Sequence, residues 1–190
     1  MPTDAQVLEN SQMVDVTTPV VLISGPVGVG KTTVGQALSE LLEHKQWPHT
    51  FVDFDQLRYT YPRPASDPWG NELGLKNLAD VWKNCSQLGS LNLIIAYVVE
   101  RKSFIERIQS AVPRASIVTF QLTAKLETLE KRVRQRETGA SLDWHLNRAA
   151  ELARTLERQD SPSDFRIATD DRSVFDIAAE MTDLIHWRSP

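Results

Sequence analysis

The sequence has little cysteine and no long apolar run. Cys85 is the only cysteine in the chain, so no disulfide can form within it, and we expect a reducing, cytoplasmic location. No stretch of about 18 consecutive apolar residues occurs, so neither a transmembrane helix nor a membrane partner is expected. The first residues, Met1 to Asp4, begin neither a basic region nor an apolar core, which argues against a secretory signal peptide.

An excess of positive charge and a metal-ligand pattern are also missing. The chain has 21 Lys and Arg against 25 Asp and Glu, a net charge of −4, so no overall field attracts nucleic acid. A local basic cleft could still bind it, but we expect no nucleic-acid partner. The four histidines show no ligand spacing, so a metal held by protein side chains alone is not expected. The oligomeric state is left open.

Five short apolar segments alternate with amphipathic helical segments from residue 18 onward. This alternation predicts an α/β protein whose parallel sheet is covered by helices on both faces. Residues 1–17 are polar and lack periodicity, so we expect a flexible tail before one domain at 18–190. The expected strands are 20–23, 50–53, 91–99, 116–122 and 165–169.

Apolar spacing within the helical segments predicts which residues face the core. Leu88 and Phe175 are expected on buried helix faces, and we interpret Cys85 as inert core packing. Ser173 stands three positions before Asp176, which resembles a capping box with Asp in place of Glu and predicts the start of the last helix.

A glycine-rich motif follows the first expected strand directly. Residues 25–32 read GPVGVGKT and fit the Walker A pattern G-x-x-x-x-G-K-[ST], which wraps a triphosphate with backbone N–H groups. A chance match in a chain of this length has a probability on the order of 1%, and the flanking strand and helix lower it further. The residues expected to bind the nucleotide are Gly25, Pro26, Val27, Gly28, Val29, Gly30, Lys31, Thr32 and Thr33.

Two side chains of this motif have assigned chemistry. Lys31 is expected to reach the β- and γ-phosphates, and the Thr32 hydroxyl to hold Mg²⁺. The GTPase motif N-K-x-D and the transporter signature L-S-G-G-Q do not occur, and the chain is short for a ring-forming ATPase. These absences favour a small kinase that uses ATP and Mg²⁺.

Acidic residues end two of the expected strands. Asp53 and Asp55 follow the second strand, where ligands bind in open α/β sheets, so Asp53 could accept a proton from an acceptor hydroxyl or hold Mg²⁺ through water. The alternative is that Asp55 caps the next helix and Asp53 is a solvated strand end. Glu100 ends a strand similar to a Walker B strand, or else it is a first-turn helix residue.

Arginines form a second candidate group. Arg132 and Arg136 are four positions apart on one expected helix, so both could contact a phosphate and offset charge in the transferred group. The alternative is a solvated basic face paired with Glu127 or Glu130. Arg148 and Arg154 are weaker candidates.

The stretch 59–70 contains three prolines and cannot be regular throughout. A loop of this length is usually functional or mobile. With Asp55 and Glu100, its basic and aromatic residues could form an acceptor pocket, although the aromatic rings could equally attach the loop to the core. These residues are Arg58, Tyr61, Arg63 and Trp69.

The motif at 25–32, the segment VDFD at 52–55 and the segment LEKRVRQR at 129–136 together resemble the small-molecule kinases of the nucleoside-monophosphate-kinase-like fold. Shikimate kinase, gluconate kinase and chloramphenicol-phosphotransferase-like proteins share this layout. The resemblance covers about residues 19–186. It implies a three-layer P-loop NTPase fold with a five-stranded parallel sheet in the order 2-3-1-4-5. It also implies a short lid at about 133–146, and a strand-two aspartate, here Asp53, that orients or deprotonates the acceptor hydroxyl.

We therefore expect an ATP-dependent phosphotransferase with Lys31, Asp53, Arg132 and Arg136 as catalytic residues and a small hydroxyl compound as acceptor. Two alternatives remain open: a polynucleotide or nucleotide kinase, suggested by the arginines, and an ATP-sensing binding protein without a substrate, whose partner-binding element would be the loop at 59–70.

Overall fold

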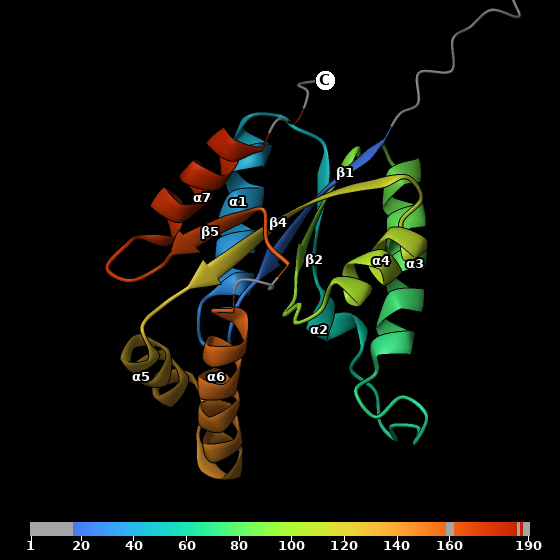
Figure 1. Cartoon of the computed structure of the whole chain (residues 1–190). Coiled ribbons are helices and arrows are strands. Elements are labelled where there is room, and N and C mark those ends of the chain that lie inside the picture. Colours follow the sequence, from blue (N-terminus) through green and yellow to red (C-terminus); the bar gives the residue numbers. More distant parts are fainter. Residues whose placement is uncertain (1–16, 159–161, 186, 188–190) are drawn as a thin grey trace, which may run out of the picture.

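A five-stranded parallel sheet forms the centre of the molecule (Figure 1). The structure, a computed structural model, describes residues 17–158, 162–185 and 187, so all but the last residue of the expected tail lies outside it. The strands run in the order β2-β3-β1-β4-β5, which confirms the predicted fold. Their bounds are β1 (Thr18–Ser24), β2 (His49–Asp53), β3 (Asn92–Ala96), β4 (Ala115–Thr123) and β5 (Phe165–Ala168).

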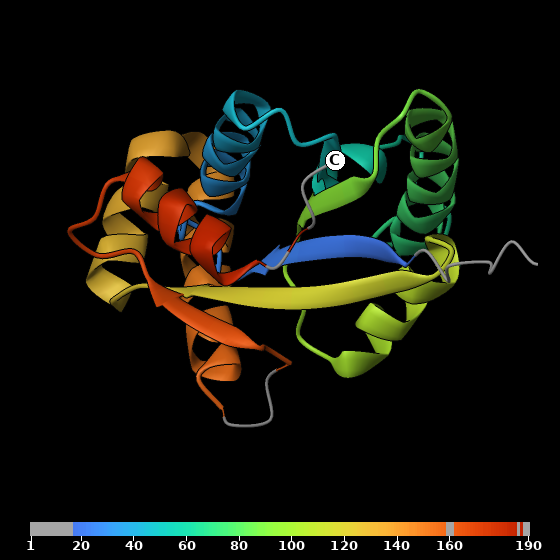
Figure 2. The same cartoon turned by 90° about the horizontal axis from the view of Figure 1, so that it is seen from above.

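Helices cover both faces of the sheet (Figure 2). The helices α1 and α7 pack together on one face, and α3 and α4 on the other. Their bounds are α1 (Lys31–His44), α2 (Phe54–Leu57), α3 (Asn71–Gln87), α4 (Lys102–Ala111), α5 (Leu126–Arg136), α6 (Leu142–Leu156) and α7 (Val174–Leu184). No helix in the described part of the chain is both long and apolar enough to cross a membrane.

The central strand β1 explains why the sequence shows a continuous apolar run there. Its side chains alternate between the two faces of the sheet. Val21 and Ile23 join the core beneath α1 and α7, whereas Val20 and Leu22 join the core beneath α3 and α4. Because β3 and β4 flank β1 on either side, all four side chains are almost completely buried.

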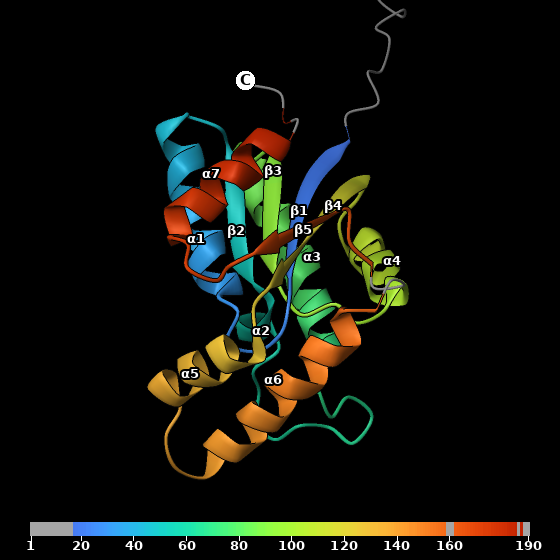
Figure 3. The same ribbon diagram turned by 60° about the vertical axis from the view of Figure 1, so that its left-hand side comes forward.

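The carboxyl ends of the strands carry the additional elements. The helices α5 and α6 pack against each other and extend beyond this edge, joined by a short 3-10 turn at Gly139–Ser141 (Figure 3). The helix α2 and the irregular stretch that follows it lie at the same end. The elements that follow β1, β2 and β4 therefore surround one edge of the sheet, where ligands bind in open α/β folds.

Two predicted core positions are wrong. Leu88 has 89% of its surface exposed and Phe175 56%. Leu88 lies one residue after the end of α3, where the chain turns at Gly89 and leaves the packed face. Phe175 lies beside the buried stripe of α7, which contains Ile177, Ala178 and Met181.

Two further predictions concern helix residues. Cys85 is half-buried, so it is not a full core residue as expected. The Ser173 side chain accepts a hydrogen bond from the Asp176 N–H, which confirms the predicted cap of α7.

Candidate active site

The loop between β1 and α1 holds its shape through glycine backbone conformations. Gly25 and Gly28 have φ values of 145° and 85°, which residues with a Cβ rarely adopt. A Cβ on Gly25 would lie 2.6 Å from the Leu122 carbonyl oxygen, and one on Gly28 would lie 3.0 Å from that of Leu129. The loop is therefore packed closely against β4 and α5, which the Walker A pattern alone does not show.

The helix α1 begins at Lys31 without a side-chain cap. Its first N–H groups and the positive end of its dipole thus face the loop, an arrangement that binds phosphate groups. The Lys31 Nζ donates to the carbonyl oxygens of Gly25, at 2.9 Å, and Pro26, at 3.1 Å, so the amine bends back over the loop.

The surroundings of Lys31 change its acid–base behaviour. Burial lowers the pKa of Lys31 from 10.5 to about 8, with a smaller lowering from Arg136, while Asp55 and Asp53 oppose the shift. Asp53 at the end of β2, Asp55 in α2 and Arg136 in α5 therefore all act on this amine. The sequence assigned Lys31 to phosphate binding, but its pKa depends on residues brought together by the fold.

Asp53 links the strand-two end to the phosphate loop. Its Oδ2 accepts a hydrogen bond of 2.7 Å from the Thr32 hydroxyl, and its Oδ1 accepts one of 3.0 Å from the Asp55 N–H. Asp53 is therefore the cap of α2, so the alternative with Asp55 as cap and Asp53 as a solvated strand end is wrong. One carboxylate group thus positions two elements and remains next to the loop.

The site also contains oxygen ligands suited to a magnesium ion. Among the described residues, no group of three His, Cys, Asp or Glu could hold a metal ion. The Thr32 hydroxyl and Asp53 carboxylate are hard oxygen donors 2.7 Å apart. Mg²⁺ is typically bound by one or two protein oxygens together with nucleotide phosphates, so these residues fit the ion.

A cavity of about 280 Å³ lies on the α5 side of the loop. Arg132 and Arg136 both line it, together with Gly30 and Val34. The opposite wall of the cavity was not predicted from the sequence. Its residues come directly after β5, so their position at the end of a strand was the available signal. That wall consists of Thr169, Arg172, Val174 and Ile177.

The two arginines of α5 have different partners. Arg132 donates to the Val29 carbonyl oxygen at 3.3 Å and to the Thr169 hydroxyl and carbonyl oxygens at 3.0 and 2.9 Å. It thereby connects the phosphate loop to the end of β5. Arg136 forms an ion pair with Glu137 at 2.9 Å. The expected alternative of pairing with Glu127 or Glu130 is not found among the described residues.

A second polar group lies on the α2 side of the loop. Arg58 forms a 2.6 Å ion pair with Asp55 and donates to the Trp69 carbonyl oxygen at 2.9 Å. Its guanidinium also lies 5.2 Å from the ring centre of Tyr97, whose hydroxyl donates to Asn71 at 3.0 Å. Sequence reasoning missed Tyr97 because it appeared to lie within strand three.

Glu100 lies close to this group but not on a strand. The prediction that strand three extends to residue 99 is wrong, because β3 ends at Ala96. Beyond this point the backbone bonds to the end of β1, where the Val99 N–H donates to the Ser24 hydroxyl. Glu100 therefore neither ends a strand nor lies in the first turn of α4, which begins at Lys102. It pairs with Arg148 of α6, and Arg148 is also paired with Glu151.

The remaining candidates lie on the exposed stretch after α2. Tyr61 and Trp69 have 93% and 58% of their surface exposed, so they do not attach the loop to the core. Arg63 is exposed, and its Nη1 lies 3.5 Å from the Pro68 carbonyl oxygen. In the described part of the chain these three side chains do not join the polar groups around Asp53.

Comparisons with known proteins agree with this geometry. A family model described as an AAA domain matches residues 21–159. None of the curated proteins matches the sequence. Among solved structures, the tunicamycin resistance protein of Deinococcus radiodurans is 18% identical with a TM-score of 0.63, covering 90% of this chain and 97% of that one.

Two kinases have similar folds. The APS kinase of Mycobacterium tuberculosis, solved with AMPPNP and APS, is 19% identical with a TM-score of 0.57, over 88% of this chain and 97% of its own. The shikimate kinase of Acinetobacter baumannii, solved with shikimate, is 18% identical with a TM-score of 0.52, over 90% of this chain and 93% of its own. The chain therefore belongs to the AAA domain family and has the fold of the P-loop kinases.

Proposed function

We propose that this protein is an ATP-dependent kinase that phosphorylates a hydroxyl group of a small molecule. The observation that carries the proposal is the 2.7 Å hydrogen bond between Thr32 and Asp53, which holds a carboxylate beside the phosphate loop. The kinase structures that share the fold, one with AMPPNP and APS and one with shikimate, support this reading.

In this proposal the triphosphate of ATP lies along the loop. The first N–H groups of α1 and the Lys31 amine bind its β- and γ-phosphates. Thr32 would hold Mg²⁺, which supplies positive charge to the phosphate oxygens. The cavity beside Arg132, Arg136 and Arg172 takes the rest of the nucleotide.

Asp53 then acts on the acceptor. The acceptor hydroxyl oxygen forms a bond to the γ-phosphorus as the bond from that phosphorus to the β–γ bridging oxygen breaks, and its proton passes to the Asp53 carboxylate. ADP leaves with the electron pair of the broken bond. Lys31, Arg132 and Arg136 offset negative charge on the transferred group, which spreads over its oxygens in the transition state.

The lid at about 133–146 is part of the same proposal. This segment comprises the end of α5, the turn at Gly139–Ser141 and the start of α6. Arg136 lies at its beginning and lines the nucleotide cavity. Closure of the lid over bound ATP would bring this charge to the phosphates and exclude water.

Transfer of a labelled terminal phosphate tests the proposal. The purified protein is incubated with Mg²⁺, terminally labelled ATP and pools of sugars, sugar acids, nucleosides, nucleotides, aminoglycosides, phenicols and DNA 5′ ends. We expect label in one small-molecule pool, and we expect Lys31→Ala to abolish it. Label in DNA 5′ ends would indicate a polynucleotide kinase, and label released only as phosphate would contradict the kinase proposal.

The exposed rings of the stretch after α2 favour one alternative, a nucleotide-dependent binding protein. Tyr59, Tyr61 and Trp69 have 81%, 93% and 58% of their surface exposed, and exposed aromatic rings are common at protein interfaces. This alternative predicts tight ATP binding without turnover and a partner protein that prefers the ATP-bound form. A pull-down in which no protein distinguishes the two forms would contradict it.

A further inference from the structure

The charges on the two sides of the phosphate loop differ. On the nucleotide side, Arg136 is paired with Glu137 and Arg172 with Glu180. Arg132, by contrast, contacts only hydroxyl and carbonyl oxygens in the described part of the chain. On the α2 side, Arg58 is paired with Asp55, and Arg148 with Glu100 and Glu151. In the proposed kinase the acceptor lies beside Asp53. The guanidiniums on the α2 side of that position are already paired with carboxylates of the protein.

Both ion pairs act on the same side chain, Tyr97. Burial raises the pKa of the Tyr97 hydroxyl, and the charges that act on it are Arg58, Asp55, Glu100 and Arg148. Asp55 also acts on Lys31. The Arg58 guanidinium lies 5.2 Å from the Tyr97 ring centre, so the Arg58–Asp55 pair lies beside Tyr97. The Glu100–Arg148 pair is close enough to act on the same hydroxyl.

Negative charge is in excess in this group. Asp53, Asp55, Glu100 and Glu151 supply four carboxylates, whereas Lys31, Arg58 and Arg148 supply three cations. Half-exposed ion pairs contribute little to stability, so an anion could displace a carboxylate partner. The displaced carboxylate would remain beside it, however, and like charges at such distances repel each other.

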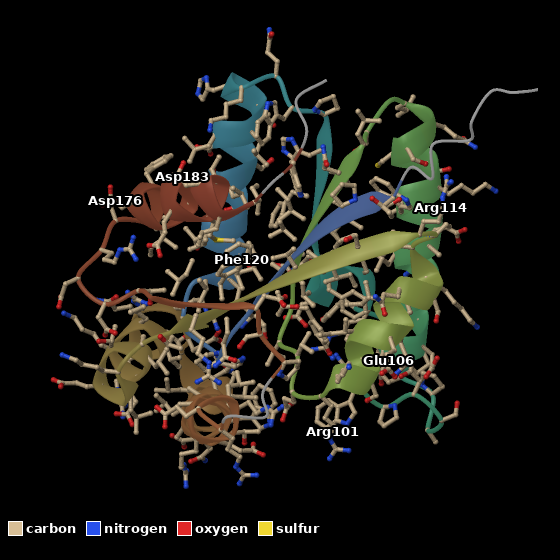
Figure 4. The ribbon with its side chains drawn as sticks, turned by 45° about the horizontal axis from the view of Figure 1, so that its top comes forward. Arg101, Glu106, Arg114, Phe120, Asp176 and Asp183 are labelled. Carbon is tan, nitrogen blue, oxygen red and sulfur yellow. The ribbon has the colours of Figure 1, made fainter. Side chains whose placement is uncertain are left out.

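Other arginines do not change this balance. Arg101, the residue after Glu100, points away from the sheet into solvent (Figure 4). Arg107 is paired with Glu72 at 2.6 Å. Arg63 has no carboxylate partner among the described residues, but it lies on the exposed stretch after α2 and contacts only the Pro68 carbonyl oxygen.

We propose that the acceptor carries neither a carboxylate nor a phosphate group, and that the site takes an uncharged or positively charged hydroxyl compound. This inference rests on the proposed kinase function and narrows its substrate class. Asp55 and Glu100 act here as specificity-determining residues, because their charges cancel those of Arg58 and Arg148.

The first test sorts the acceptor pools of the labelling experiment by charge. The groups are phosphates and carboxylates, uncharged polyols and nucleosides, and amino sugars. Label is expected in the uncharged or amino group. Label that moves mainly into the phosphates or carboxylates would overturn the inference while leaving the kinase function intact.

The second test does not need turnover. The protein is saturated with Mg²⁺ and AMPPNP, so that the phosphate loop is filled, and titrated calorimetrically with gluconate and with sulfate at low salt. We expect no measurable binding by the unmodified protein. Asp55→Asn combined with Glu100→Gln keeps the side-chain shapes, frees the Arg58 guanidinium and removes one of the two carboxylates paired with Arg148. We expect this double variant to bind both anions at least about tenfold more tightly.

Glu72→Gln is the matched control, because it frees Arg107 outside this group and should leave anion binding unchanged. Gluconate or sulfate binding by the unmodified protein as tight as by the double variant would overturn the inference. A double variant that remains folded and gains no anion affinity would overturn it as well. Either result can be obtained whether or not the protein transfers phosphate.

Discussion

At the residue scale, the low pKa of Lys31 predicts how ATP binding depends on pH. The pKa of about 8 in the free protein means that the amine loses its proton as the pH rises through this value. Since only the cation attracts phosphate strongly, ATP affinity should fall above pH 8, by up to about tenfold per pH unit. The measurement is ATP affinity between pH 6.5 and 9.5, by calorimetry.

Lys31→Arg is the control for this pH dependence, because a guanidinium stays charged across the range. Its affinity should vary little with pH. An unmodified protein with constant affinity up to pH 9.5 would show that Lys31 does not contribute its charge as proposed.

The second prediction at this scale concerns Asp53. Asp53→Asn keeps a cap for α2 but cannot take a proton, so kcat should fall about 10²–10⁴-fold with little change in ATP affinity. Asp53→Ala should lose the cap as well and destabilise the protein by about 1 kcal/mol. Steady-state kinetics and chemical denaturation separate the two effects, and full kcat in Asp53→Asn would exclude Asp53 as the base.

At the element scale, the start of α3 depends on Asp67. Its carboxylate accepts hydrogen bonds from the N–H groups of Asn71, Glu72 and Leu73, at 2.8 to 3.1 Å. The same residue ends the irregular stretch after α2, because the Gly70 N–H donates to its carbonyl oxygen at 3.0 Å. Asp67 therefore attaches the exposed stretch to the helix that covers the sheet.

Asp67→Ala should lower the free energy of unfolding by about 1–2 kcal/mol, because it leaves helix N–H groups without a protein acceptor. Asp67→Asn should retain most of the stability. Ser66→Ala, at the exposed neighbouring position, is the matched control and should change little. Denaturant unfolding measures all three, and an Asp67→Ala variant as stable as Ser66→Ala would contradict the capping role.

At the scale of the whole molecule, lid closure predicts a change in hydrogen exchange. Binding of Mg²⁺ and AMPPNP should slow amide exchange in residues 137–146, because closure buries the turn between α5 and α6. Exchange in α4, which lies on the face of the sheet away from α1 and α7, should stay unchanged and serves as the internal reference. Lys31→Ala with the same ligand should show no slowing, and equal exchange with and without nucleotide would argue against a lid.

The sequence alone was sufficient to predict those features that depend on contacts between residues close together in the chain. The phosphate loop is made of consecutive residues, so the spacing of Gly25, Gly30 and Lys31 already predicted a glycine turn followed by a helix. The alternation of apolar strands and amphipathic helices predicted the layers of the sheet for the same reason. The strand order came from the resemblance to a known fold, and the structure confirms it.

The tertiary structure decided what depends on contacts between distant segments. Glu100 and Arg148 are 48 positions apart, and only the packing of α6 near the end of β3 pairs them. The end of β3 at Ala96 depends on where β1 ends. Residue type and spacing therefore determine local backbone shape, whereas ion pairing, burial and the resulting pKa of Lys31 depend on neighbours that only the folded chain supplies.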